Sequence, residues 1–410
     1  MQPAPAGPAG LGRLAAALAY RDFRILWLGA FTSTSGTWMQ KVAQGWLVFA
    51  LTGSSFYLGL DDFLGQLPIL LFTLLGGVVA DRHDRRRLLL ASQLVQMSAA
   101  FVLAALVAGE VVRIWHVLAL SFLTGLAQAF GGPAYQSLLP SLVDRRALPN
   151  AIALNSIQFN LARVVGPLLA GLAIAAWGLP AAFALNGLSF LVVVAAILSL
   201  KVAHVPPADR QGVLEELRGG LAYARSRPAI LELTALAFVT TFLGLPVLTL
   251  LPVFAAEVFG GGMSLYSRLM TFSGVGAVTG ALVVAWLGRF PHMGRTLLVV
   301  QAALGALIAG FALSRSYWAS ALLLVLASAA LIVVFSLTTS LVQLLAPDRL
   351  RGRVLSIYMV AFRGGMPLGS LAAGYAASLV SAPAVLAAGG AMLAIAAVAF
   401  LAKGRGVRRA

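Results

Sequence analysis

Two adjacent carboxylates, Asp61 and Asp62, stand inside an apolar stretch of the sequence, and Lys41 stands inside the apolar stretch before it. Charged groups are costly in an apolar environment, so those that occur there pair with one another or serve ion and proton movement. If both stretches are helices that meet at one membrane surface, Lys41 lies about 15 Å below it and the carboxylates about 8 Å. A lysine side chain covers most of that difference, so the sequence allows a Lys41–Asp61 or a Lys41–Asp62 pair.

One of these two carboxylates is a candidate for binding a proton that is exchanged for a substrate, because partial removal from water changes how readily a carboxylate takes up a proton. The other interpretation is that Asp61 and Asp62 only hold helices or water near the outer end of the stretch. Glu257 is a further proton candidate, in the second half of the chain.

Polar residues also line up on single helical faces. One face of the stretch that holds Lys41 carries Ser33, Thr37, Gln40, Lys41 and Gln44, at spacings that fit a helix. A second stripe consists of Ser156, Asn160 and Arg163, and Arg363 stands in a later stretch. We expect these residues to line an aqueous cavity, because unpaired charge in hydrocarbon is expensive. Hydrogen bonding between helices without substrate contact is the other interpretation.

The elements that hold these residues must be membrane helices. The chain has 410 residues, of which 60% are hydrophobic and 10% charged, whereas soluble domains carry about 25% charged residues. This composition excludes a water-soluble enzyme. A helix needs about 20 apolar residues to cross a bilayer, and the sequence offers twelve such stretches: 24–50, 56–80, 87–109, 114–137, 150–176, 181–200, 229–256, 264–288, 295–314, 317–345, 354–379 and 382–402.

The largest interruption separates six of these stretches from the other six. We therefore expect an N-terminal segment 1–23, a six-helix bundle 24–200, a linker 201–228, a second six-helix bundle 229–402 and a basic tail 403–410. Within the linker, residues 214–221 have the pattern of a short amphipathic helix on the membrane surface.

The net charge is +16, and the positively charged residues are distributed unevenly over the segments between the spans. Most of the 29 Lys and Arg fall in segments that share one side of the membrane if both termini lie there. This distribution predicts cytoplasmic termini in a bacterial-type inner membrane, and it removes the main argument for nucleic-acid binding.

Cofactor and metal chemistry find little support. The chain has no cysteine and its four histidines are scattered, so we expect no metal site, no cofactor and no enzymatic activity. The run Gly274–Gly280 imitates a dinucleotide-binding loop, but no strand–turn–helix pattern surrounds it. Close packing of helices explains it better.

The two halves of the chain repeat a motif. Arg163-Val164-Val165-Gly166-Pro167-Leu168 in the fifth stretch corresponds to Arg363-Gly364-Gly365-Met366-Pro367-Leu368 in the eleventh. This correspondence indicates a duplicated six-helix unit, the kind of parallel repeat from which rocking transporters are built.

The segment that follows the second stretch points to a family. Residues 76–87 closely resemble the loop signature of the major facilitator superfamily, Gly-x-x-x-Asp-Arg-x-x-Arg-Arg, whose positions are filled by Gly77, Asp81, Arg82, Arg85 and Arg86. The resemblance implies that Gly77 permits close helix approach. It also implies that Asp81 braces the bundles on the cytoplasmic side, facing the positive start of the eleventh span near 352–353. A generic basic loop would explain the arginines but not the acid and the glycines.

A second motif narrows the resemblance. Gly166, Pro167, Ala170 and Gly171 are similar to the Gly-Pro-x-x-Gly-Gly motif in span five of exporters of this superfamily, with Ala170 in place of one Gly. Ordinary small-residue packing is the other interpretation. Residues 131–143 look like the drug and siderophore branch that includes macrolide-efflux and enterobactin-exporter proteins.

The resemblance implies an all-α polytopic membrane protein with twelve transmembrane helices in two pseudo-symmetric six-helix bundles. It implies proton-coupled export of a small amphipathic compound, such as a drug or siderophore, by alternating access. The expected partners are this small-molecule substrate, the lipid bilayer and protons, and we expect a monomer. A metabolite importer, a lysolipid flippase of the same fold and a non-transporting membrane receptor remain as alternatives.

Overall fold

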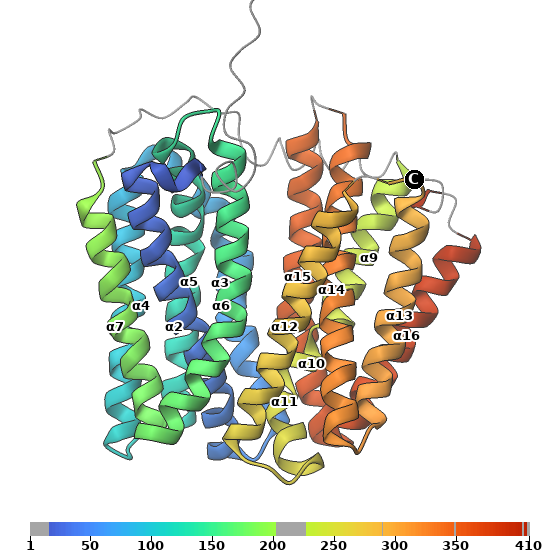
Figure 1. Ribbon diagram of the computed structural model, residues 1–410. Helices are drawn as coiled ribbons and strands as arrows, with labels where there is room; N and C mark the ends of the chain where they lie inside the picture. Colours follow the sequence, from blue (N-terminus) through green and yellow to red (C-terminus); the bar gives the residue numbers. More distant parts are fainter. Residues whose placement is uncertain (1–15, 202–226, 289, 348–349, 404–405, 408–410) are drawn as a thin grey trace, which may run out of the picture.

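The computed structural model describes residues 16–201, 227–288, 290–347, 350–403 and 406–407. Within these ranges the chain is helical and contains no strand. In this described part of the chain, twelve long helical segments run side by side (Figure 1). Their bounds are α2 Arg21–Thr52, α3 Ser55–Arg82, α4 Arg85–Ala108, α5 Ile114–Leu138, α6 Leu148–Trp177, α7 Leu179–Ser199, α9 Pro228–Gly244 with its continuation to Val258, α12 Met263–Leu287, α13 Met293–Leu313, α14 Tyr317–Leu345, α15 Arg351–Leu379 and α16 Ala382–Lys403. Short 3₁₀ turns add η1 Ala16–Ala19 and η2 Leu139–Leu142.

The helices have the length and composition of membrane spans. Among the described residues, eleven are long and apolar enough to cross a membrane. The remaining long helix is α2, which is less apolar because it carries the polar stripe from Ser33 to Gln44. The predicted twelve spans are therefore all present as long helical segments.

The seventh segment is not one continuous α-helix, although the sequence predicted a single span over 229–256. α9 ends at Gly244, and the chain continues through α10 Pro246–Thr249, α11 Leu251–Val253 and the π-turn η3 Phe254–Val258. Pro246 and Pro252 each remove a backbone donor within this short distance, which interrupts the helical hydrogen bonds. The predicted amphipathic helix 214–221 lies outside the described residues.

The helices form two bundles with the same internal packing. Helices α2 to α7 pack against one another, and α9 to α16 do the same. Each main pairing recurs: α3 packs on α5 as α12 packs on α14, and α2 packs on α7 as α9 packs on α16. The bundles meet through two further pairs, α3 with α15 and α6 with α12. This arrangement confirms the predicted pseudo-symmetric fold.

The two ends of the molecule differ. We call the end with the turns at 83–84, 144–147 and 200–201 the termini side, and the end with the turns at 53–54, 109–113 and 178 the far side. The bundles lie closest together at the far side and further apart at the termini side (Figure 1). Aromatic pairs join them at the far side, where Trp46 stacks on Tyr266 with ring centres 6.4 Å apart. The far side is therefore the closed end of the structure.

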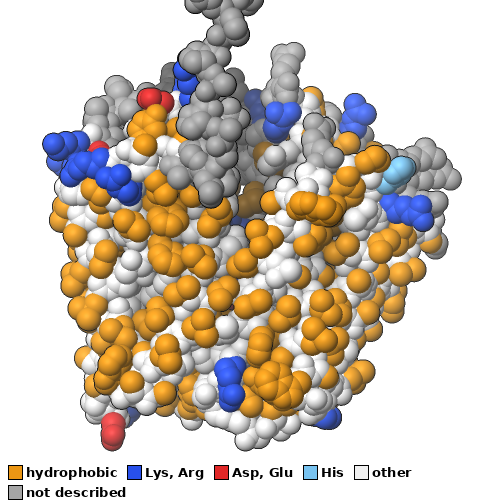
Figure 2. Space-filling view, in the orientation of Figure 1, with side chains coloured by type: hydrophobic (Ala, Val, Ile, Leu, Met, Phe, Trp, Pro, Cys, Tyr) orange, Lys and Arg blue, Asp and Glu red, His pale blue; other side chains and the backbone are white. Residues whose placement is uncertain are grey.

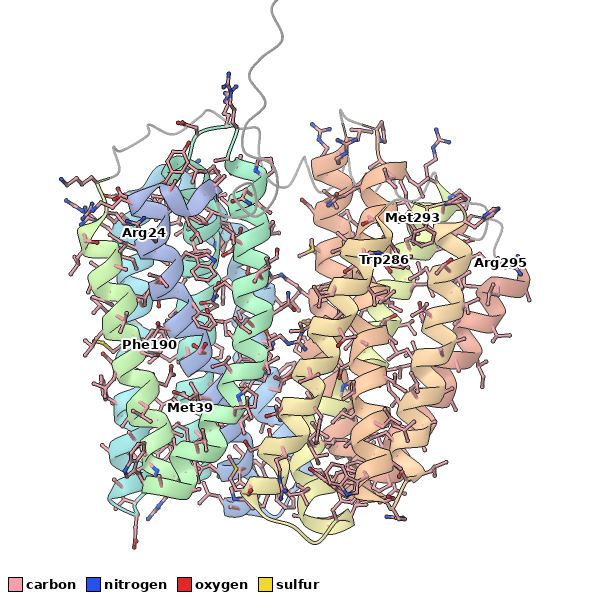
Figure 3. All side chains as sticks on the ribbon, in the orientation of Figure 1. Arg24, Met39, Phe190, Trp286, Met293 and Arg295 are labelled. Carbon is pink, nitrogen blue, oxygen red and sulfur yellow. The ribbon has the colours of Figure 1, made fainter. Side chains whose placement is uncertain are left out.

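The surface matches a membrane setting. Figure 2 shows hydrophobic side chains over the whole height of the visible face, with charged side chains mainly at its two ends. Large apolar side chains such as Trp286 and Leu172 are strongly exposed, as expected where lipid replaces water. In Figure 3, Arg24 and Arg295 lie toward the termini side, whereas Met39 and Phe190 lie within the first bundle.

The start of the first bundle is tied down at the termini side. The Tyr20 hydroxyl donates a hydrogen bond to Asp144 Oδ2 at 2.9 Å, and the amide of Lys201 donates to Asp22 Oδ2 at 3.0 Å. The bond to the Asp144 carboxylate raises the pKa of Tyr20 above its ordinary value. These contacts join the beginning of α2 to the loop before α6 and to the end of α7.

Candidate functional site

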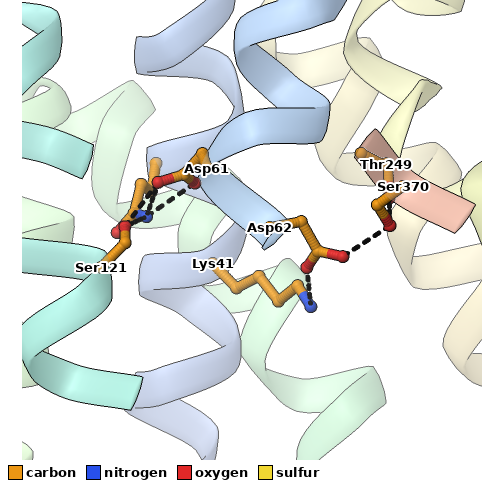
Figure 4. Close-up of polar contacts among 7 residues, drawn as sticks. Lys41, Asp61, Asp62, Ser121, Thr249 and Ser370 are labelled. Atoms are coloured by element: carbon orange, nitrogen blue, oxygen red, sulfur yellow. Dashed lines mark hydrogen bonds and ion pairs between the residues drawn. The ribbon is translucent and has the colours of Figure 1, made fainter. Parts of the chain in front are cut away.

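Asp61 lies on α3, which faces α2 and α5, and it is held by neutral donors from both. Gln44 Nε2 lies 3.0 and 2.8 Å from the two carboxylate oxygens, and the Ser121 hydroxyl donates to Oδ1. Gln44 Nε2 also reaches Ser121 Oγ at 2.8 Å. Asp61 is therefore built into a small polar network inside the first bundle (Figure 4).

Asp62 faces the other bundle. Its Oδ1 lies 3.4 Å from Lys41 Nζ, and its Oδ2 accepts a 2.6 Å hydrogen bond from Ser370 Oγ on α15. The Ser370 hydroxyl lies 3.1 Å from Thr249 Oγ1. One carboxylate thus touches a cation of the first bundle and a hydroxyl of the second (Figure 4). Of the two pairs that the sequence allowed, the structure forms Lys41–Asp62.

Small residues bring α3 and α15 together at this point. A Cβ added to Gly59 would overlap the Ser370 carbonyl, and one added to Gly374 would lie 2.9 Å from the Gly59 Cα. Since the backbones are nearly in contact, the short Asp62 and Ser370 side chains can meet directly. The glycines therefore set the geometry of the bond between the bundles.

The exporter-type motif of α6 lies at the second crossing, between α6 and α12. The Ser267 hydroxyl of α12 donates to the Pro167 carbonyl at 2.5 Å. A Cβ on Gly171 would lie 2.8 Å from Ser267 Oγ, and a Cβ on Gly166 would overlap α2 near Trp38. Ala170 is fully buried. The motif thus places α6 close to both neighbours.

The glycine run of α12 serves packing, as the sequence predicted. A Cβ on Gly274 would lie 2.5 Å from the Arg163 carbonyl, and Gly276 and Gly280 come equally close to the backbone of α14. The resemblance to a dinucleotide loop is therefore coincidental.

Two of the predicted cavity cations share one aromatic ring. Arg163 Cζ lies 5.3 Å from the centre of the Trp38 ring, and Lys41 Nζ lies 5.6 Å from it. A ring face attracts cations. Within the described part of the chain, Arg163 has no carboxylate at ion-pair distance.

The rest of the predicted stripe on α2 divides between core and surface. Gln40 Oε1 accepts a 2.7 Å hydrogen bond from Asn186 of α7, and Ser33 is buried, so these two belong to the interior of the first bundle. Thr37 is exposed and bonds to its own helix.

The stripe on α6 keeps its polar groups near the surface. Ser156 is exposed, and its hydroxyl bonds within its own helix. Asn160 donates to the Ser156 carbonyl. Arg363, on α15, lines a pocket of about 210 Å³ between α3 and α15.

The loop that resembles the superfamily signature holds the first bundle together at the termini side. Arg86 Nε donates to the Ile197 carbonyl at the end of α7 at 2.8 Å. Arg85 donates to the Ser137 carbonyl at 3.2 Å and lies 3.7 Å from Asp81. Arg82 is exposed. A gating role of this loop stays a prediction.

Gly77 does not make the close helix approach that the sequence predicted for it. Gly77 has open space around it, whereas a Cβ on Gly76 would overlap the Ala129 carbonyl of α5. The close helix approach is made by Gly76, because its face of α3 points at α5.

Glu257, the second-half proton candidate, is exposed on η3, on the bundle opposite Asp61 and Asp62.

Four residues of this site were not predicted from the sequence. Ser121, Thr249, Ser267 and Ser370 are single hydroxyls in apolar helices, where such residues commonly bond to their own backbone. Ser370 had one usable signal, because it follows Pro367 by three residues, where the first half has Ala170 after Pro167. The α3–α15 crossing therefore has a hydroxyl group, that of Ser370, at the repeat position where the α6–α12 crossing has the methyl group of Ala170.

Comparison with known proteins identifies the family. The sequence pattern of the family described as transmembrane secretion effector matches residues 14–405. The chain is 28% identical to the staphyloferrin A transporter of Staphylococcus aureus (82% of this chain, 84% of the relative). It is 24% identical to macrolide efflux protein A of Streptococcus pyogenes (69% and 70%) and 26% identical to the enterobactin exporter EntS of Shigella boydii (70% and 68%).

Solved structures agree on the fold. A bacterial homolog of the human lysosomal transporter Spinster, in an inward-facing and occupied conformation, superposes with a TM-score of 0.74 at 15% identity, over 94% of this chain and 97% of that one. A point mutant of the peptide transporter POT, in complex with sulfate, gives a TM-score of 0.75 at 13% identity, over 94% and 95%. The chain is therefore a membrane transporter that belongs to the transmembrane secretion effector family of the major facilitator superfamily.

Proposed function

We propose that this protein is a secondary active exporter that moves a small amphipathic compound, such as a drug or siderophore, in exchange for protons. The direction is supported by the relatives, which include a macrolide efflux protein and an enterobactin exporter. The site supports a transport mechanism in which two rigid bundles rock about a central space.

The observation that carries the proposal is the position of Asp62 between the bundles. Its carboxylate bonds to Lys41 on one side and to Ser370 on the other, next to the network that holds Asp61. A proton bound by this Asp61–Asp62 pair changes the charge that Lys41 and Ser370 face. Proton binding therefore alters the contact that closes the far side, which is the coupling that an antiporter requires.

The structure fits one state of an alternating-access cycle. Its far side is closed by the α3–α15 and α6–α12 crossings. With both termini in the cytoplasm, this is the state in which substrate enters from the cytoplasm and meets Thr37, Asn160 and Arg163. In the opposite state, the loop around Asp81 braces the bundles on the cytoplasmic side, and Glu257 remains near the outer surface.

The first test measures gradient-dependent uptake into everted membrane vesicles, with rhodamine 123, erythromycin, enterobactin and fluorescein as probes. Wild type is compared with Asp61→Asn and Asp62→Asn, which remove the charge and keep the shape. We expect at least one of the two variants to lose gradient-driven accumulation by roughly 5- to 150-fold, the range of a typical coupling free energy. Glu110→Gln, on an exposed far-side turn, is the matched control and should transport like wild type.

Two results contradict the proposal. Full gradient-driven accumulation in both aspartate variants would remove the carboxylates from the coupling step. Exit of a metabolite or lysolipid from the everted vesicles, with no probe accumulating in them, would instead identify an importer or a flippase of the same fold.

A further inference from the structure

A pocket with a volume of about 210 Å³ lies between the two bundles, where α3 faces α15. Its walls are largely apolar, and Gln66 and Arg363 supply its polar groups. The apolar part consists of Ile69, Leu70, Met359, Phe362 and Met366. Such a volume accommodates one ring or head group, so the pocket suits one end of a drug-sized ligand.

Among the described residues, no carboxylate lies at ion-pair distance from Arg363. The ion pairs among the described residues are Arg21–Asp22, Lys41–Asp62, Arg85–Asp81 and Arg87–Asp84, and none includes Arg363. The residue lies near the middle of α15, Arg351–Leu379, where an unpaired charge is costly unless water or a ligand meets it. Its repeat counterpart Arg163 differs, because it faces the Trp38 ring.

The pocket adjoins the contact between the bundles. α3 and α15 run antiparallel, so that Gly59 meets Gly374, Asp62 meets Ser370, and Leu70 meets Gly364. Gln66 lies one helical turn beyond Asp62, toward the termini side. A ligand in the pocket therefore sits beside the Asp62–Ser370 bond, on the open side of it.

Charge around this position favours an anion. Among the residues that line the pocket, Arg363 is the charged one, and its charge is positive. A guanidinium binds carboxylate, sulfonate and phenolate groups through charge-assisted hydrogen bonds.

We infer that this pocket binds the negatively charged end of an amphipathic organic anion, with Arg363 as its ion partner and Gln66 as a hydrogen-bond donor. Phe362 and the two methionines contact the apolar part, since aromatic and thioether groups adapt to ring systems. This inference deepens the proposed export function by naming a substrate class. It concerns binding alone and does not depend on direction or coupling.

The test measures equilibrium binding to the full-length protein in lipid nanodiscs without any gradient. Fluorescein, an anion, and rhodamine 123, a cation on the same ring system, serve as probes by fluorescence anisotropy. We expect fluorescein to bind wild type at least about tenfold more tightly than rhodamine 123. Arg363→Gln should weaken fluorescein binding by about 10- to 100-fold, the loss expected for a hydrogen bond to a charged group.

Two control variants separate loss of charge from loss of fold. Arg363→Lys keeps the charge and should retain most of the binding of fluorescein. Arg268→Gln removes an exposed arginine that faces Tyr317, outside the pocket, and should bind like wild type. Displacement of fluorescein by salicylate or by lysophosphatidylglycerol then tells whether a soluble or a lipid anion fits the site better.

The inference is overturned if Arg363→Gln binds fluorescein as tightly as wild type, or if wild type prefers rhodamine 123. Displacement by neither anion would also contradict it. Loss of transport in the vesicle assay would leave this binding result unchanged, so the failure of one proposal is distinguishable from the failure of the other.

Discussion

The hydrogen bond from the Ser370 hydroxyl of α15 to the Asp62 carboxylate of α3 joins the two bundles. Asp62 is a candidate proton site and also pairs with Lys41 of the first bundle. The same carboxylate therefore belongs to the proton site and to the contact between the bundles near the closed far side. Hydrogen bonds to charged groups contribute about 1.5–3 kcal/mol each. That amount is enough to shift a two-state equilibrium by an order of magnitude or more.

Ser370→Ala should therefore open the far side more often. The chain has no cysteine, so spin labels can be attached to Val111→Cys and Arg315→Cys, which are exposed on far-side turns of the two bundles. Pulsed electron paramagnetic resonance in nanodiscs should show a larger population at long distance, increased by roughly tenfold. Ser378→Ala, on the same helix but bonded only to its own turn, is the matched control. Equal distance distributions in wild type and Ser370→Ala would show that the bond does not hold the far side closed.

At the residue scale, the charged residues inside the spans are visible in the sequence, but not all of their partners are. Depths in adjacent helices of one bundle limit the partner of Lys41 to Asp61 or Asp62, and the structure forms the pair with Asp62. The partner of Asp62 on α15 does not follow from such depths, because the register between two bundles depends on where Gly59 and Gly374 meet. No local pattern encodes that meeting point.

Helices were the most predictable elements of this chain. Apolar length alone indicates where they lie, because each span must satisfy its backbone inside the bilayer. The positions of prolines are less informative about where a helix ends. Pro68, Pro133, Pro167 and Pro367 stay inside continuous helices, whereas α9 breaks before Pro246. The difference depends on whether neighbouring groups replace the lost hydrogen bond, which the sequence does not state.

Two adjacent glycines allow a matched test of helix packing. Gly76→Ala should lower the thermal stability of the detergent-solubilised protein, since its Cβ overlaps the Ala129 carbonyl of α5 and overpacking costs about 1–3 kcal/mol. Gly77→Ala meets open space and should leave the midpoint of unfolding unchanged or slightly higher. A lower midpoint of unfolding for Gly77→Ala than for Gly76→Ala would contradict this and would identify Gly77 as the residue that lets the helices approach.

At the scale of the whole molecule, the repeated packing of the two bundles explains why one motif occurs twice. Arg163 and Arg363 occupy matching positions on α6 and α15, the helices that cross to the other bundle. The copies have diverged, because Arg163 faces Trp38 and Arg363 faces a pocket. The sequence repeat predicts the symmetric framework, but the divergence is visible only once side chains of both bundles are placed together.

The proposed exchange requires that substrate and protons move in opposite directions across the membrane. The most direct measurement uses proteoliposomes with a trapped pH indicator and no initial pH gradient, to which a compound transported by the wild-type protein is added. We predict that inward movement of the compound drives protons outward, so that the interior becomes more alkaline, and that Asp61→Asn, Asp62→Asn or both abolish this change. Acidification of the interior, or substrate movement without any change in internal pH, would contradict proton-coupled exchange.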